Sequence, residues 1–213
     1  MMSGCRKEEA VSNDLSLVKK LSKALSPAFG RMRTLLRKIS GFFPELLCRM
    51  RYRSSLYRSS CRIAKYSDLK KDRGAYGEFL VYDALRREKG RWLFNLYLPK
   101  GEEKTEIDAL LLSERGIFLL ESKNFSGRVY GSVGNPEWFH TFETSRGIKK
   151  QRFFNPIMQN SAHKKALGRL IDREEVIFPM VVFGKNTDLR VQAPKEYSKE
   201  LMTLKRLLSA VHS

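Results

Sequence analysis

Hydrophobic and polar positions follow two periods after residue 73, one typical of helices and one typical of strands. The predicted elements, in order, are a helix over 74–87, strands over 92–98, 106–112 and 116–123, a continuation of the sheet at 128–131, a helix from Pro156 to about Ile171, a strand over 176–183 and a last helix over 198–211. Asn155-Pro156 marks the start of the second helix, because the fixed φ of proline suits a first helical turn. The core order α-β-β-β-α-β predicts an α/β fold in which a mixed central sheet carries helices.

Three charged residues interrupt the apolar pattern of two neighbouring strands. Asp108 lies inside an apolar run over 107–112, and Glu121 and Lys123 close the next run. Side chains alternate along a strand, so Glu121 and Lys123 point to the same side. A short turn at 113–115 joins the two strands, and folding them about this turn brings Asp108 close to opposite Glu121 if the register allows. Two carboxylates and an ammonium group are therefore expected to converge.

These groups suit metal-dependent phosphodiester chemistry. Mg²⁺ prefers carboxylate and water oxygens, so we expect Asp108 and Glu121 to be ligands of Mg²⁺ (or Mn²⁺), with the carbonyl of Ser122 as a third ligand. A bound cation polarises the phosphodiester and lowers the pKa of its water. Lys123 is then placed to orient that water, to help deprotonate it or to stabilise charge on the phosphate. The structural alternative is a buried salt bridge between Lys123 and one carboxylate, which gives the same local pattern.

Several short motifs occur in an order that matches a known family. They are Gly74-Ala75-Tyr76-Gly77-Glu78, Ile107-Asp108, Gly116-Ile117-Phe118-Leu119-Leu120-Glu121-Ser122-Lys123-Asn124, Trp138, Asn155-Pro156-Ile157-Met158-Gln159-Asn160 and His163. Over about residues 73–190 the chain resembles the nuclease-related domain family, NERD, of the restriction-endonuclease-like PD-(D/E)xK superfamily. The resemblance implies a nuclease core and a catalytic group of Asp108, Glu121 and Lys123. It implies supporting catalytic roles for Glu78 on the first helix and Gln159 on the crossover helix. The usual Pro-Asp pair of the superfamily is Ile107-Asp108 here.

The other marked residues have structural alternatives. Glu78 also fits a helix-face carboxylate near a helix N-terminus, and Gln159 also fits a cap or a bridge to the backbone. His163 follows Gln159 by one helical turn and so could face the same cleft, but we expect it to pack or to lie at the surface. Trp138 and Phe139 are expected in the core rather than as platforms that stack on bases.

Basic residues favour a polyanionic partner. The 213 residues contain 41 Lys plus Arg against 23 Asp plus Glu, a formal net charge of +18, and such a charge favours nucleic acid or an acidic membrane surface. Lys149, Lys150 and Arg152 precede the Asn-Pro helix start. We expect them to bind the phosphate backbone of nucleic acid, with an ordinary solvated run as the alternative.

Residues 1–72 are predicted to form a basic extension, helical or partly disordered, ahead of a nuclease-related domain over 73–213. Apolar stripes recur at helical spacing within 17–39, and arginines over 49–62 alternate with Tyr52 and Tyr57. Three interpretations stay open: a solvated extension, a nucleic-acid arm, and amphipathic helices that bind an anionic membrane surface.

Several classes of protein are disfavoured. No apolar run approaches the roughly 20 residues of a spanning helix, and the N-terminus lacks an apolar stretch of the signal-peptide type. An odd count of 3 cysteines without a Cys-x-x-Cys pair fits a reducing cytosol, so we expect a cytoplasmic protein that can also sit at a membrane surface. The pattern predicts a metal-dependent nuclease that acts on DNA. The rivals are a nucleic-acid-binding protein without cleavage and a membrane-surface protein.

Overall fold

The computed structural model describes residues 44–100 and 103–212. The chain forms two compact units, Met1–Met50 and Arg51–Ser213. Residues 44–50 of the first unit are helical, whereas the stripes predicted within 17–39 lie outside the described residues. Among the described helices, none is long and apolar enough to cross a membrane.

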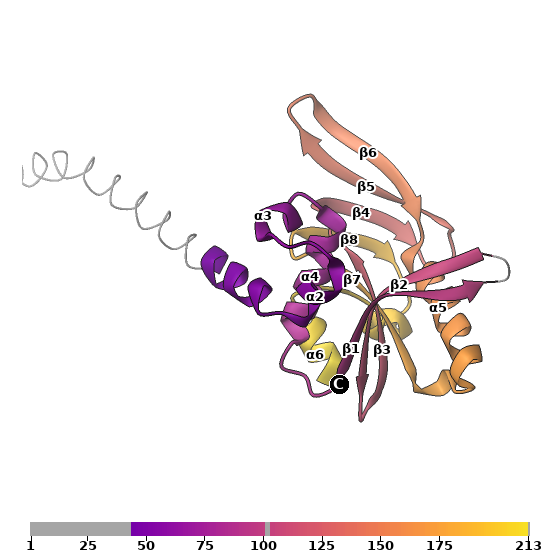
Figure 1. Ribbon diagram of the computed structural model, residues 1–213. Helices are drawn as coiled ribbons and strands as arrows, with labels where there is room; N and C mark the ends of the chain where they lie inside the picture. Colours follow the sequence, from indigo (N-terminus) through magenta and orange to yellow (C-terminus); the bar gives the residue numbers. More distant parts are fainter. Residues whose placement is uncertain (1–43, 101–102, 213) are drawn as a thin grey trace, which may run out of the picture. The chain divides into compact units, whose positions relative to one another are not determined.

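The second unit combines helices with two sheets (Figure 1). Its helices are α2 (Leu56–Cys61), α3 (Tyr66–Leu69), α4 (Arg73–Leu85), α5 (Pro156–Ile171) and α6 (Leu207–His212), with 3-10 turns at Glu174–Val176 and Lys195–Lys199. Its strands are β1 (Arg91–Lys100), β2 (Glu103–Ser113), β3 (Gly116–Lys123), β4 (Gly127–Ser132), β5 (Glu137–Thr144), β6 (Gly147–Phe154), β7 (Ile177–Phe183), β8 (Thr187–Gln192) and β9 (Leu201–Thr203). The described strands form a five-stranded sheet in the order β1-β2-β3-β7-β9 and a four-stranded sheet in the order β6-β5-β4-β8.

The predicted mixed α/β core is confirmed. Helix α4, strands β1 to β3, helix α5 and strand β7 follow one another in the predicted order. Strands β1, β2 and β3 pair antiparallel, and β7 joins β3 in parallel after the crossover through α5. The sheet is therefore mixed, as the pattern indicates.

Two predicted elements are wrong. Residues 128–131 do not continue the central sheet: they lie in β4, which pairs with β5 and β8 in the second sheet. The chain changes sheets at Gly127, whose φ of +92° and close approach to Thr141 exclude a side chain. The last helix over 198–211 is also wrong, because Leu201–Thr203 forms β9 beside the end of β7 and buries Met202, so helix α6 starts only at Leu207.

Helices cover both faces of the five-stranded sheet. On one face α4 and α6 pack on β2, β3 and β7 in a cluster of Val81, Leu85, Ala109, Leu111, Phe118, Leu120, Met180, Val182, Met202, Leu207 and Val211. On the other face α5 contributes Leu167 to a cluster with Leu98, Ile107, Leu110, Leu119 and Ile177. Strand β3 therefore runs between α4 and α5, and its last residues are within reach of side chains from both helices.

The four-stranded sheet packs one face against the end of β7. Trp138 is fully buried there with Val129, Ile157, Val181 and Phe183, which confirms the core position predicted for Trp138. Phe139 follows it in β5 and, because side chains alternate, points to the opposite face of this sheet. The core position predicted for Phe139 is therefore wrong.

Candidate active site

Asp108 lies where strand β2 changes the face that it presents to the helices. Ala109 packs in the cluster against α4, whereas Ile107 packs in the cluster against α5. Residues two apart in a regular strand share a face, so the alternation is interrupted between them. Asn95, which lies in β1 between the partners of these two residues, has a φ of 50° in the left-handed region. This irregularity places a polar residue at a position that is not part of either apolar cluster.

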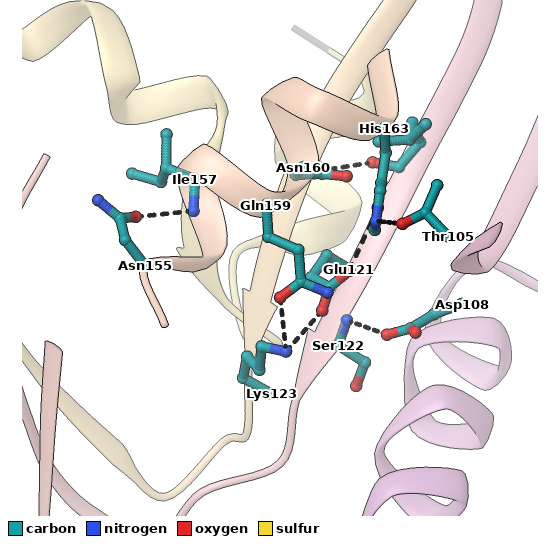
Figure 2. Close-up of polar contacts among 11 residues, drawn as sticks. Thr105, Asp108, Glu121, Ser122, Lys123, Asn155, Ile157, Gln159, Asn160 and His163 are labelled. Carbon is teal, nitrogen blue, oxygen red and sulfur yellow. Dashed lines mark hydrogen bonds and ion pairs between the residues drawn. The ribbon is translucent and has the colours of Figure 1, made fainter. Parts of the chain in front are cut away.

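The end of β3 brings Glu121 and Lys123 beside Asp108. The β2–β3 ladder ends at Ala109 paired with Leu120, so Asp108 and Glu121 are the next positions of the predicted register. The backbone N–H of Ser122 donates to Asp108 Oδ2 at 2.8 Å, and Lys123 Nζ donates to Glu121 Oε1 at 2.6 Å (Figure 2). The hairpin thus joins both carboxylates to one segment of three residues in β3.

Helix α4 supplies Glu78 because it lies close to β3. A Cβ atom at Gly77 would lie 2.6 Å from Asn124 Cβ and 2.8 Å from Ser122 Oγ, so only glycine permits this approach. Glu78 is the next residue, and the phenol of Tyr57 on α2 donates to its Oε2 at 2.8 Å. The close approach of α4 therefore positions the third carboxylate of the site.

Helix α5 is fixed at its start and along its buried face. Asn155 Oδ1 accepts hydrogen bonds from the N–H groups of Ile157 and Met158 at 2.9 and 3.4 Å and caps the helix. Asn160 Nδ2 donates to the carbonyl of Leu119 at 3.2 Å and ties the helix to β3. Gln159 is the residue before Asn160, and its Oε1 accepts a hydrogen bond from Lys123 Nζ at 3.3 Å.

His163 is buried one turn further along α5. Its Nε2 lies 2.9 Å from Thr105 Oγ1, and its Nδ1 lies 3.7 Å from Glu121 Oε2, beyond hydrogen-bond distance (Figure 2). The residue is 3% exposed. His163 therefore packs against the candidate site, and of the two predicted positions only the packing one is confirmed.

Burial raises the pKa of all three carboxyl groups. The pKa of Glu121 rises to about 7 through desolvation and repulsion from Asp108, against which Lys123 acts. The pKa of Glu78 also rises to about 7 through desolvation and the charge of Asp108, although the hydrogen bond from Tyr57 lowers it. For Asp108 desolvation again raises the pKa, while the Ser122 N–H and Lys123 lower it. The Lys123 ammonium alone does not balance the negative charge of this group.

The donor set fits a hard divalent cation with an incomplete protein shell. Glu121 Oε2 is buried, and among the described residues it finds no hydrogen-bond partner. In the same part of the chain, no group of three or more His, Cys, Asp or Glu side chains is arranged to hold a metal. The described residues therefore form no all-protein cage for calcium or zinc, whereas Mg²⁺ is commonly held by one or two carboxylates and keeps several waters.

The basic run predicted to bind phosphate lies in the four-stranded sheet, whereas Asp108, Glu121 and Lys123 lie in the five-stranded sheet. Lys149, Lys150 and Arg152 are exposed on β6, the strand that precedes α5, in a hairpin with β5. Since side chains alternate along a strand, Lys150 and Arg152 share one face and Lys149 points to the other. Their role in binding nucleic acid stays a prediction.

Tyr57 and Thr105 contact the site residues, although no sequence motif indicates a role for either of them. Tyr57 is fully buried, as is Tyr52, which donates to the carbonyl of Ile63, so neither ring is available as part of a solvated arm. The arginines around them in the sequence give no sign that these two rings are buried. Thr105 follows Glu102-Glu103-Lys104, a polar stretch that carries no signal of a nearby site.

Comparison with known proteins identifies the family of this chain. The model of the nuclease-related domain, NERD, matches residues 73–184. The chain belongs to this family. An uncharacterized protein of Bacillus anthracis is 34% identical over 90 residues, which cover 41% of this chain and 40% of that protein. No solved structure matches the chain. The compact unit begins at Arg51, before the first residue that the NERD model matches.

Proposed function

We propose that this NERD protein is a metal-dependent nuclease that hydrolyses phosphodiester bonds, with DNA as its substrate and Mg²⁺ or Mn²⁺ as its cofactor. One observation carries the proposal most directly. Glu121 is 2% exposed, yet its Oε2 has no hydrogen-bond partner within the described chain, and it stands beside a second carboxylate that raises its pKa. The Lys123 pair uses the other oxygen, and His163 Nδ1, at 3.7 Å, lies beyond hydrogen-bond distance of Oε2, whereas buried charges are normally paired and hydrogen-bonded.

Each residue has a proposed role. Asp108 and Glu121 hold the cation, which when bound activates water and polarises the phosphate. Lys123 orients the water or stabilises negative charge on the phosphate, and Gln159 Oε1 keeps its ammonium in place. Glu78, which Tyr57 holds from α2, orients water on the α4 side.

The rival function is binding of nucleic acid without cleavage, in which the Glu121–Lys123 pair serves the fold. Lys123 Nζ lies 2.6 Å from Glu121 Oε1, and this contact is compatible with either function. The two functions differ in whether a divalent cation makes the protein cleave DNA, and the experiment measures that difference.

The test is incubation with plasmid and linear DNA in Mg²⁺, Mn²⁺ or EDTA, for the wild type and for Asp108→Asn. Cleavage by the wild type that needs a divalent cation, and its loss in Asp108→Asn, are expected. Asp68→Asn is the control, because Asp68 is an exposed aspartate of α3 paired with Lys71. In EDTA, Asp108→Asn should melt at a temperature equal to or above that of the wild type, since it removes one of the repelling carboxylates. A wild-type melting temperature that millimolar cation does not change would count against the site.

A further inference from the structure

Four side chains form a row across the second sheet. Arg190 of β8 pairs with Tyr130 of β4, Tyr130 pairs with Phe139 of β5, and Phe139 pairs with Arg152 of β6. Directly paired residues place their side chains on the same face. Adjacent strands are about 4.8 Å apart, so the row spans about 14 Å. Two aromatic rings therefore lie between two guanidinium groups.

The row lies on the face that does not pack on the core. Val129 and Trp138, the neighbours of Tyr130 and Phe139 along their strands, point inward and are fully buried. Tyr130 is 39% exposed. Figure 1 shows the β5–β6 hairpin, which carries part of this face, extending away from the body of the unit. The described chain thus presents an accessible aromatic surface here.

Three arginines on this face form ion pairs with exposed carboxylates. Arg190 and Arg128 both approach Asp188, at 3.0 and 3.9 Å, and Arg152 approaches Glu137 at 3.5 Å. These side chains are 45% to 70% exposed, and exposed ion pairs contribute little to the stability of the fold. A phosphate can therefore replace a carboxylate at small cost. Lys150 Nζ lies 4.0 Å from the centre of the Phe139 ring, so this ring already binds a cation.

We infer that the outer face of the β6-β5-β4-β8 sheet binds single-stranded nucleic acid, with bases stacked on Tyr130 and Phe139 and phosphates on Arg190, Arg152 and Lys150. Aromatic rings on a sheet bind unpaired bases because every base has a free face once it leaves the duplex. In a duplex those faces are stacked on their neighbours, and the rings gain nothing. The surface therefore selects unpaired strands over duplex.

The position of the sheet suits a strand that continues into the candidate site. Strand β4 begins at Gly127, four residues after Lys123, so the two Cα atoms are at most about 14 Å apart. The inference rests on the proposed function only in that the bound strand is the substrate. Binding itself is measured without a divalent cation.

The test is the affinity of a fluorescein-labelled oligothymidylate of 12 nucleotides, and of a duplex of the same length, measured by anisotropy in EDTA. Tyr130→Leu keeps an apolar side chain and removes the aromatic ring. We expect its affinity for the single strand to fall about 5- to 100-fold, with the duplex changed less than about twofold. Tyr97→Leu is the matched control, because Tyr97 is an exposed tyrosine on β1 of the other sheet. Circular dichroism melts check that both variants fold.

A second pair of variants tests the face rather than the ring. Lys150→Ala should weaken binding and reduce the salt slope by about 0.7, the value for one phosphate contact on a single strand. Lys89→Ala removes the same charge from an exposed position in the turn before β1 of the other sheet. We expect no change in the salt slope for Lys89→Ala.

Several results would overturn the inference. These are equal effects of Tyr130→Leu and Tyr97→Leu, equal effects of the two lysine variants, or equal losses on single strand and duplex. A dimer that dissociates in Tyr130→Leu while single-strand binding persists would assign the face to a second copy of the chain. Cleavage is scored separately with Mg²⁺. Ring-dependent binding without cleavage leaves this inference standing and refutes the nuclease, and cleavage with unaltered binding by the variants does the reverse.

Discussion

Tyr57 donates a hydrogen bond from its phenol to Oε2 of Glu78 at 2.8 Å. Tyr57 lies before the residues matched by the NERD family, whereas Glu78 lies within them. The Tyr57 ring is fully buried and meets Phe94 edge-on at 5.2 Å. Helix α2 therefore belongs to the second unit and supports the candidate site from outside the family's segment.

The Tyr57→Phe variant tests this support. It keeps the ring and its packing but removes the donor to Glu78. If Glu78 acts at the site, the turnover number for DNA should fall about 10- to 150-fold, since a lost hydrogen bond to a charged group corresponds to about 1.5 to 3 kcal/mol. The Michaelis constant should change little, because Tyr57 is buried and does not contact solvent.

Tyr52→Phe is the matched control for that measurement. Tyr52 is equally buried, but its hydroxyl contacts Cys61 Sγ at 3.4 Å rather than a site carboxylate. We expect both variants to lose similar stability and only Tyr57→Phe to lose turnover. Equal turnover in the two variants would show that Tyr57 serves the fold alone.

Lys123→Met separates the catalytic role from the structural one. If the ammonium stabilises the transition state, turnover should drop about 100-fold or more while affinity for DNA in EDTA stays within a few-fold. If the ammonium serves only the fold, the variant leaves Glu121 buried without a cation and loses about 3–5 kcal/mol of unfolding free energy. Denaturant unfolding and single-turnover cleavage distinguish these outcomes, and normal activity per folded molecule would remove Lys123 from the catalytic group.

Stability should fall as the pH rises from about 4.5 to 7 when divalent cations are absent. Glu78 and Glu121 have pKa values raised to about 7 from an ordinary 4.5. In this window the folded protein keeps protons that the unfolded chain releases, so the free energy of unfolding declines with pH, by up to about 1.4 kcal/mol per pH unit and group. Denaturant unfolding in EDTA from pH 5 to 8 measures the decline.

Two comparisons assign that decline to the site. Glu121→Gln should flatten the decline, whereas Glu143→Gln, at an exposed glutamate of β5, should leave it unchanged. Saturating Mg²⁺ should raise stability more at pH 8 than at pH 5, because the cation competes with protons for the carboxylates. A decline that persists in Glu121→Gln and ignores Mg²⁺ would place its origin elsewhere.

Two N-terminal deletions should behave differently. Deletion of residues 1–50 removes a compact unit with 10 basic and 4 acidic residues, so the chemical step should survive. If those residues bind DNA, the log–log salt dependence should flatten by roughly 0.9 per lost contact on duplex DNA. Deletion of residues 1–72 also removes the fully buried Tyr52, Tyr57 and Leu69, and should lower the melting temperature by about 10 °C or more.

The same deletions test the membrane alternative. Binding to anionic vesicles is measured beside binding to DNA at several salt concentrations. Vesicle binding that deletion of residues 1–50 abolishes, with an unchanged DNA salt slope, would assign the extension to a lipid surface rather than to nucleic acid.

Local pattern determined much of the core from the sequence. Asn155-Pro156 marked the start of α5 because capping and a fixed φ are properties of adjacent residues. Asp108, Glu121 and Lys123 stood out because charge inside an apolar run needs a compensating partner. The short turn then fixed which of them were neighbours, and the observed β2–β3 register is the predicted one.

Contacts between residues distant in the chain were decided by tertiary structure alone. Nothing near Tyr57 or Thr105 in the sequence indicates Glu78 or His163, because each pair is joined only after helices and strands pack. The pairing of β4 with β8 rather than with the central sheet likewise depends on residues some sixty positions away. Periodicity shows that a strand has two faces, but only its pairing and packing decide which face is buried. For that reason the sequence marks Lys149 and Lys150 as one basic run, and the fold separates them.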